Sequence, residues 1–267
     1  MIINTNMLSL NAHRNMGTNT SKLGKASEKL SSGLRINRAA DDAAGLAVSE
    51  RLRSQIKGLD QASKNVQDGI SYAQTAEGAL DEVSAMLTRS KELLVQASTG
   101  TYSSDDVTNI KEELVALGAE MTNVITSTEF NGISITLGAK VATGQDGSLE
   151  IALPAVTLTA VDDLTGALAD VSDAAGAKTA ITKVEEGIKD ISTQRAKIGA
   201  IQNRLEHTLQ NQKVTSENLT TSESRVRDTD MASEMMNFTK YNVLNQAAQS
   251  MMAQANLIPN QALGLLG

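Results

Sequence analysis

Apolar residues recur at alternating spacings of four and three along much of the chain. From Ala43 to Ala97 this register predicts a coiled-coil helix, because a repeat of 3.5 residues keeps one apolar seam facing a partner. At about 1.5 Å per residue the helix would be roughly 80 Å long. Its apolar positions are Leu52, Ile56, Leu59, Val66, Ile70, Ala73, Leu80, Leu87 and Leu94, and its polar slots are Ser63, Glu77, Ser84 and Lys91.

Two further segments keep this register. Ser103 followed by Asp106 predicts a capping box that starts a helix ending near Thr126, which should fold back antiparallel on the first. A second long helix is predicted from about Ala177, with a link at Arg227–Asp230. The apolar positions are Ile110, Leu114, Leu117, Met121 and Val124, then Ile181, Val184, Ile188, Ile191, Ile198, Leu205, Leu209, Leu219 and Val226, with polar slots at Arg195, Gln202, Gln212, Ser216 and Glu223.

Both ends of the chain lack charge over long stretches. Residues 1–12 carry no charged side chain, and neither do the 27 residues after Lys240. Two uncharged amphipathic ends are explained if they pair with each other or with neighbouring copies. A membrane-surface helix is the alternative, and the shortage of Lys and Arg counts against it. The C-terminal helix begins near Met231, and its stripe is Leu244, Ala248, Met251, Ala255 and Ile258.

The middle of the chain has a different pattern. The turn signal Phe130-Asn131-Gly132 is followed by predicted strands at 133–137 and 148–153, on either side of a Gly-rich loop. Residues 155–161 are a candidate third strand, and 162–176 are predicted loop. The predicted fold class is therefore mainly α: an elongated antiparallel coiled-coil bundle of paired N- and C-terminal helices, with a small β-hairpin region mid-chain.

This plan divides the chain into four parts. Residues 1–42 form a terminal helix and linker, and 43–176 a long helix, its return helix and the β-hairpin region. Residues 177–227 form the second long helix and 228–267 the C-terminal helix. Because the second half repeats the elements of the first in reverse order, the two halves should bundle together.

Composition narrows the class of protein. Aromatic residues make up 2% of the chain, and only two prolines interrupt it, so long helices are favoured over a globular core. The absence of cysteine excludes disulfides and thiolate metal sites. No stretch approaches 18 apolar residues and no basic-then-apolar leader occurs, so we expect neither a membrane span nor a cleaved signal peptide.

Charge is unevenly distributed along the chain. The net charge is −7, yet residues 1–60 carry nine Lys and Arg against five Asp and Glu, while residues 100–190 carry five against fifteen. The acidic segment is interpreted as a solvated face. Because no basic patch with stacking aromatics occurs, we expect no nucleic-acid partner.

The sequence contains no constellation that indicates catalysis or metal binding. His13 and His207 have no HxxxH or HExxH partner, and the adjacent pairs Asp41-Asp42 and Asp162-Asp163 diverge in any regular element. No nucleotide-binding glycine motif and no GxSxG motif occur. The ten methionines are interpreted as adaptable packing residues. We therefore expect no enzyme, no cofactor, and no catalytic or metal site.

The stretch from Leu30 to Gln55, LSSGLRINRAADDAAGLAVSERLRSQ, joins the N-terminal segment to the first long helix. Gly33 breaks the preceding helix, and a basic loop follows. An Ala-rich helix is predicted from Ala39, with two acidic residues in its first turn, where they suit the helix dipole. By composition alone this stretch is a packing surface.

Three blocks resemble the bacterial flagellin family. They are MIINTNMLSLNAHRN at the start, the stretch at 30–55, and the C-terminal run SRVRDTDMASEM followed by NVLNQAAQSMMAQANLIPNQALGLLG. The resemblance covers residues 1–140 and 177–267, and the short segment between them implies that variable outer domains are absent. It implies a filament subunit exported by a flagellar type III pathway to the extracellular filament. The end helices would form an inner tube and the long helices an outer tube.

The resemblance also implies site residues and partners. Arg89 and Leu93 match positions that contact a flagellin-sensing Toll-like receptor, and Glu113 matches a third, although Thr88 and Lys91 depart from the usual motif. The implied partners are further copies of the chain, an export chaperone, and the filament cap and junction proteins. A cytosolic inflammasome sensor would read the tail leucines. The assembly residues implied are Leu8, Leu244, Ala248, Met251, Ala255, Ile258, Leu263, Leu265 and Leu266.

Two functions are weighed. The first is a structural subunit that self-assembles into the flagellar filament for motility, ordering its terminal helices as it polymerises. The second is a hook–filament junction protein that shares the same bundle but does not polymerise alone. The full C-terminal signature favours the filament subunit.

Overall fold

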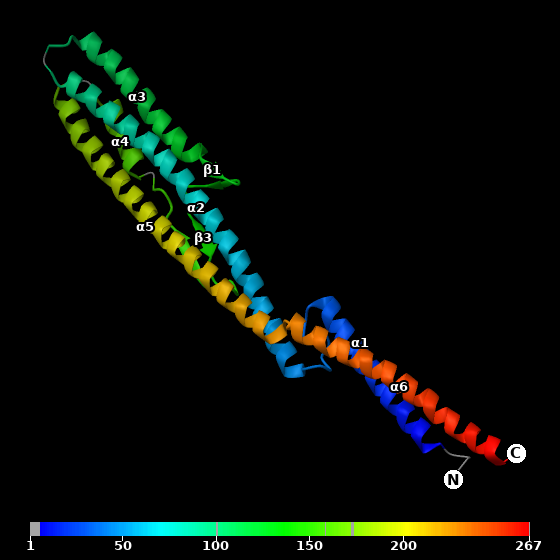
Figure 1. The fold of residues 1–267 in the computed structure, drawn as a ribbon. Helices are drawn as coiled ribbons and strands as arrows, with labels where there is room; N and C mark the ends of the chain where they lie inside the picture. Colours follow the sequence, from blue (N-terminus) through cyan, green and yellow to red (C-terminus); the bar gives the residue numbers. More distant parts are fainter. Residues whose placement is uncertain (1–5, 100, 158, 172–173, 267) are drawn as a thin grey trace. The chain divides into compact units, whose positions relative to one another are not determined.

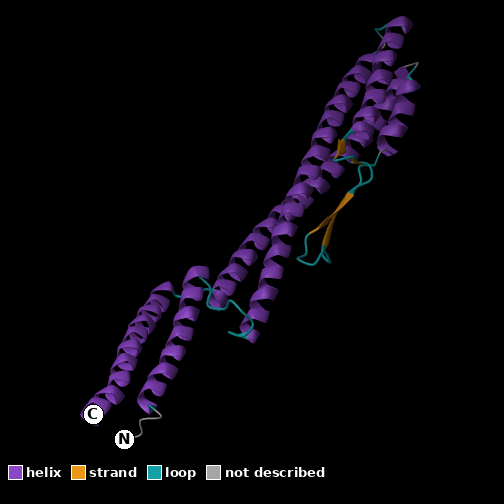
Figure 2. Ribbon diagram, turned by 90° about the vertical axis from the view of Figure 1, so that its right-hand side faces the viewer, coloured by secondary structure: helices purple, strands orange, loops and turns teal. Residues whose placement is uncertain are grey.

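The computed structural model describes residues 6–99, 101–157, 159–171 and 174–266, with side chains to Leu257 in the last helix. The chain forms two compact units, Met1–Ser54 with Asn218–Gly267, and Gln55–Glu217. The boundary crosses both long helices, α2 (Ala43–Ala97) and α5 (Ala174–Arg227). The predicted mainly α class of long packed helices with small antiparallel strand pairs is confirmed (Figures 1 and 2).

The first unit is built on an antiparallel pair of helices, α1 (Met7–Ser32) and α6 (Met231–Leu266), which lie side by side in both views (Figures 1 and 2). Asn6 caps α1 by accepting from the Ser9 N–H at 3.1 Å, and its side-chain nitrogen donates to the Ala255 carbonyl at 2.7 Å. Farther along the pair, Lys22 of α1 lies over the ring of Tyr241 of α6. The two uncharged ends of the chain thus pair with each other.

The linker between α1 and α2 is held by hydrogen bonds. Gly33 ends α1 in the left-handed conformation, and the Arg35 N–H donates to the Arg227 carbonyl at 2.6 Å. The prediction of a helix from Ala39 was wrong, because α2 begins at Ala43. Asp42 precedes the helix and accepts from the Gly45 N–H at 2.9 Å. A short acidic side chain satisfies a free N–H better from the capping position than from inside the first turn.

Asp41 makes the linker sensitive to acid. The N–H of Arg38, followed by that of Asn37 and by nearby Lys25 and Lys29, holds the pKa of Asp41 below its usual value. A lowered folded-state pKa contributes stability above the unfolded pKa that is lost as the pH falls through the folded value. We expect the protection factor of the Arg38 amide, which compares its exchange rate with that of an unstructured amide at the same pH, to fall below about pH 4, and Asp41→Asn to remove most of this pH dependence.

Hydrogen exchange followed by NMR between pH 5 and pH 3 measures that loss. Asp105, an exposed acid in the first turn of α3, is the control position, and Asp105→Asn should leave the Arg38 profile as it is in the parent. An unaltered pH profile in Asp41→Asn would contradict the assignment.

The second unit packs the rest of α2 and α5 with α3 (Ser104–Ser127) and α4 (Thr159–Ala169) around one apolar core. The capping box is confirmed, because the Ser103 and Asp106 side chains each accept from the other's backbone N–H. Many apolar positions of the predicted heptad register are buried. They are Leu59, Val66, Ala73, Leu80, Leu87 and Leu94 on α2, and Val184, Ile191, Ile198 and Leu205 on α5. The second long helix starts slightly earlier than predicted, at Ala174 instead of about Ala177.

The β region differs from the prediction. The pair β1 (Glu129–Phe130) and β2 (Ile133–Ser134) is joined by a tight turn with positive φ at Asn131 and Gly132. The strand predicted at 133–137 covers only two residues, because the chain turns again after Ser134, whose carbonyl accepts from the Leu137 N–H at 3.2 Å. The second hairpin pairs β3 (Ala139–Ala142), in the segment predicted to be loop, with β4 (Glu150–Leu153).

The candidate strand at 155–161 and most of the loop predicted at 162–176 were also wrong; residues 170 and 171 are not helical, and 172–173 lie outside the described residues. Residues Thr159–Ala169 form α4, which contacts α3. Leu164, Leu168 and Val171 are buried at helical spacing, but Ala, Gly and Asp dilute this short stripe in the sequence. Packing against α3 therefore decided the conformation of this segment.

Candidate assembly surface and receptor-contact region

The seam between α1 and α6 mixes small, polar and large apolar side chains. Most positions that are at least half-buried in this pair follow a 4–3 register on both helices. In that register lie Ser9, Ala12, Met16, Asn19, Leu23, Ala26 and Leu30 on α1, and Glu234, Phe238, Tyr241, Asn245, Ala248, Met252 and Ala255 on α6. Among the side chains that the structure describes in these two helices, only Ala26 and Ala255 are fully buried, so the pair within one chain encloses little apolar core and is held weakly.

The predicted assembly residues on α6 fall on two sides of that helix. Ala248 and Ala255 lie in the seam, whereas Leu244 is 40% exposed and Met251 is 64% exposed. On α1, Leu8 is 62% exposed. Ile258, Leu263, Leu265 and Leu266 lie outside the residues whose side chains the structure describes.

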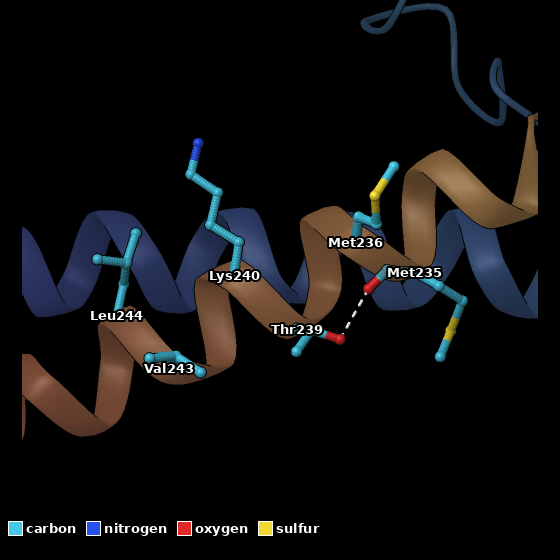
Figure 3. A pocket seen from close by; sticks show the side chains of 6 residues that line it. All are labelled: Met235, Met236, Thr239, Lys240, Val243 and Leu244. Carbon is cyan, nitrogen blue, oxygen red and sulfur yellow. Dashed lines mark hydrogen bonds between the residues drawn. The ribbon is translucent and has the colours of Figure 1, made fainter.

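Other large apolar side chains of both helices remain on the surface. In Figure 3, Met236, Lys240 and Leu244 form one row along α6 and Met235, Thr239 and Val243 form the adjacent row, and all six residues line one shallow open hollow. Exposed apolar patches of this kind mark interaction sites. We call these residues the outer face: Met7, Leu8, Leu10, Met235, Met236, Val243, Leu244, Met251 and Leu257.

Sequence reasoning missed part of the outer face. Met235, Met236, Val243 and Leu257 did not fit the single stripe assigned to this helix, although residues four apart, such as 236, 240 and 244, share one side. Two apolar faces on one helix are the signal that could have found them, because a helix that is apolar on more than one side needs more than one partner.

Two of the predicted receptor-contact residues meet on the surface of the second unit. Arg89 on α2 pairs with Glu113 on α3, 3.0 Å from nitrogen to oxygen, and with Glu92 at 3.4 Å. The hydrogen bond that Arg89 donates to Glu113 is the main reason that the pKa of Arg89 is raised. Both partners are about half exposed, so they can meet a ligand without rearrangement.

Leu93, the third residue predicted to contact the receptor, is buried and not on the surface. Its side chain is 3% exposed and belongs to the core shared by α2, α3 and α5. It lies on the 4–3 seam side of α2, one residue before Leu94. We therefore assign Leu93 to the core, where it supports the surface that carries Arg89.

The described residues carry no metal-binding constellation: no group of three or more His, Asp or Glu among them could hold an ion. Within the same residues, no helix combines the length and the apolar character that a membrane crossing requires.

Fold and surface together define a class of protein, a helical subunit whose terminal helix pair presents an uncovered apolar face. The family model for the N-terminal helical region of bacterial flagellin matches residues 3–140, and the model for the C-terminal helical region matches residues 181–266. The flagellin of Halalkalibacterium halodurans is 50% identical over 272 residues, and that of Bacillus subtilis 45% identical over 303, each match covering both chains fully.

Solved structures agree. The crystal structure of Bacillus cereus flagellin aligns with a TM-score of 0.51 at 32% identity, over 56% of this chain and 88% of that one. A putative flagellar hook-associated protein from Vibrio parahaemolyticus aligns with a TM-score of 0.60 over 70% of this chain and 100% of that one, and at 11% identity it shows the shared fold alone. The chain belongs to the bacterial flagellin family. It is a structural subunit that self-polymerises into the flagellar filament.

Proposed function

We propose that this subunit polymerises through the outer face of the α1–α6 pair, which becomes ordered against neighbouring copies. The observation that carries the proposal is the exposure of nine large apolar side chains on that face, from Leu244 at 40% to Met236 at 68%. Burial of apolar surface at about 25 cal/mol per Å² offsets the conformational entropy lost on ordering. The weak seam alone leaves each pair dependent on its neighbours.

The four parts of the chain take distinct places in this proposal. The terminal parts 1–42 and 228–267 form the inner tube, and 43–176 with 177–227 form the outer tube. The filament lies outside the cell. Its proposed partners are the export chaperone, the filament cap and the junction proteins, and the outer face is the surface that a chaperone would cover before export.

Sedimentation with negative-stain microscopy tests the proposal. The purified full chain should form pelletable filaments, and sulfate should promote them because it strengthens apolar burial. Filament seeds should remove the lag. A full chain that stays soluble in every condition, seeds included, would favour the alternative, a hook–filament junction protein.

Receptor binding is a second proposed activity, centred on Arg89 and Glu113. Because Arg89 is half exposed and already oriented by Glu113, its guanidinium can donate to an acidic partner at little entropic cost. We expect Arg89→Ala to weaken binding of the monomer to the flagellin-sensing Toll-like receptor roughly tenfold. For the cytosolic sensor, the proposed contacts are Leu263, Leu265 and Leu266.

Surface plasmon resonance with the receptor ectodomain measures the effect on receptor binding. Lys183→Ala is the matched control, since Lys183 is an exposed cation of the second unit that pairs with Glu186 at 3.0 Å. Equal affinities of Arg89→Ala and the parent would remove the direct contact.

A further inference from the structure

A buried amide joins three elements of the second unit. Gln212 on α5 is 5% exposed, and its side-chain nitrogen donates to the carbonyl oxygen of Thr143 at 2.7 Å. Its side-chain oxygen accepts from the Ser63 hydroxyl of α2 at 3.2 Å. Thr143, which follows β3, is 4% exposed. The amide therefore links α5, α2 and the β3–β4 hairpin away from solvent.

We propose that Gln212 is the positioning residue that sets the register of α5 against α2 and seats the β3–β4 hairpin on their seam. It occupies a core position, because it continues the sevenfold series of buried residues Val184, Ile191, Ile198 and Leu205. A polar residue at one such position specifies register in coiled coils at some cost in stability.

Apolar contacts alone do not determine the register of α5 against α2. If α5 slid by one heptad, Gln212 would face Ile56 or Ile70 in place of Ser63, and another apolar residue of α5 would take its slot. Apolar packing would survive that shift because the seam repeats every seven residues. The amide would be buried without its partners, which opposes the shift.

The ion pairs between the two helices are weaker determinants of register. Arg195 meets Asp81 at 2.8 Å and Lys91 meets Glu185 at 2.9 Å, but all four side chains are between 34% and 66% exposed. Solvent screens such pairs and they contribute little. Gln212 is protected from this screening by its burial.

The β3–β4 hairpin lies close against α2, and few hydrogen bonds hold it there. A Cβ atom at Gly69 would lie 2.6 Å from Val141 Cγ2, and one at Gly58 would collide with the backbone carbonyl of Gln145. The hydrogen bond from Asn65 to the Ala142 carbonyl is long, at 3.5 Å. Removing the Gln212 amide would leave the buried carbonyl of Thr143 without its short donor.

Introduced cysteines can report the register, because the chain has none of its own. The Ser216 hydroxyl donates to the Asp60 carboxylate at 3.2 Å, so Asp60→Cys with Ser216→Cys should cross-link in the observed register. Asp60→Cys with Leu209→Cys reports a shift by one heptad. In the Gln212→Leu background we expect the first cross-link to fall at least twofold and the second to appear.

Hydrogen exchange of the same full-length monomer reports the hairpin. Gln212→Leu should raise the exchange rates of the amides in 141–143 at least tenfold. Gln202→Leu is the matched control, an identical change at a half-buried polar slot of the same seam, and should leave both readouts as in the parent. If Gln212→Leu does not fold, Gln212→Met makes a more nearly isosteric change.

Parent-like cross-linking and exchange in Gln212→Leu or Gln212→Met would overturn the proposal, as would equal effects in Gln202→Leu. The measurements are made on the monomer, so they do not depend on whether the chain polymerises.

Discussion

Leu244→Asp is expected to abolish filament formation while the unit Gln55–Glu217 stays folded. Leu244 lies on the outer face and is 40% exposed in the single chain, so a carboxylate there is hydrated and harmless before assembly. Polymerisation through that face would bury the charge without a partner, which is strongly unfavourable. Circular dichroism of the monomer should be close to the parent, and sedimentation should leave the variant in the supernatant even with seeds.

Val214→Asp is the matched control for this experiment. Val214 is an apolar residue of α5 with a similar exposure of 47%, outside the outer face. It should still assemble, because the same change in chemistry falls on a different surface. Filaments of normal yield from Leu244→Asp would show that the outer face is not the polymerisation surface.

Leu87→Ala is expected to destabilise the second unit by about 2–5 kcal/mol, since truncation of a buried leucine combines lost transfer energy with a cavity. Leu87 is 1% exposed and faces α5, where a Cβ at Gly187 would lie 3.7 Å from it. For a unit of this size the melting temperature should fall by roughly 5–15 °C. Thermal unfolding of the monomer, followed by far-UV circular dichroism, measures the shift.

Leu137→Ala provides the comparison in the same unit. Leu137 is 77% exposed, so the same truncation should change stability by no more than about 0.5 kcal/mol. A melting temperature for Leu87→Ala within a degree of that for Leu137→Ala would contradict the core assigned around Leu87.

The sequence by itself determined the long helices and which of their faces are apolar. The 4–3 register from Ala43 to Ala97 and the capping box at Ser103 predicted the bounds of α2 and the start of α3 because both signals are local and repeated. The uncharged ends predicted the α1–α6 pair for a related reason, since a long stripe without charge has to be covered. The receptor pair Arg89 and Glu113 came from the family resemblance.

Tertiary structure decided the conformation and burial of segments whose sequence patterns were short or ambiguous. The segment Thr159–Ala169 became a helix that packs on α3, and Leu93, which is 3% exposed, proved to belong to the apolar core of the second unit. On α6, α1 covers the small side chains at Ala248 and Ala255 and leaves Leu244 and its neighbours exposed.

Gln212 shows the same division most clearly. In the sequence it was only a polar slot in an apolar seam, the same as Gln202. Its partners, Ser63 and Thr143, are 149 and 69 residues away. Periodicity indicates which face of a helix is buried, but which partner covers that face depends on contacts between residues distant in sequence, and these exist only once the chain has folded.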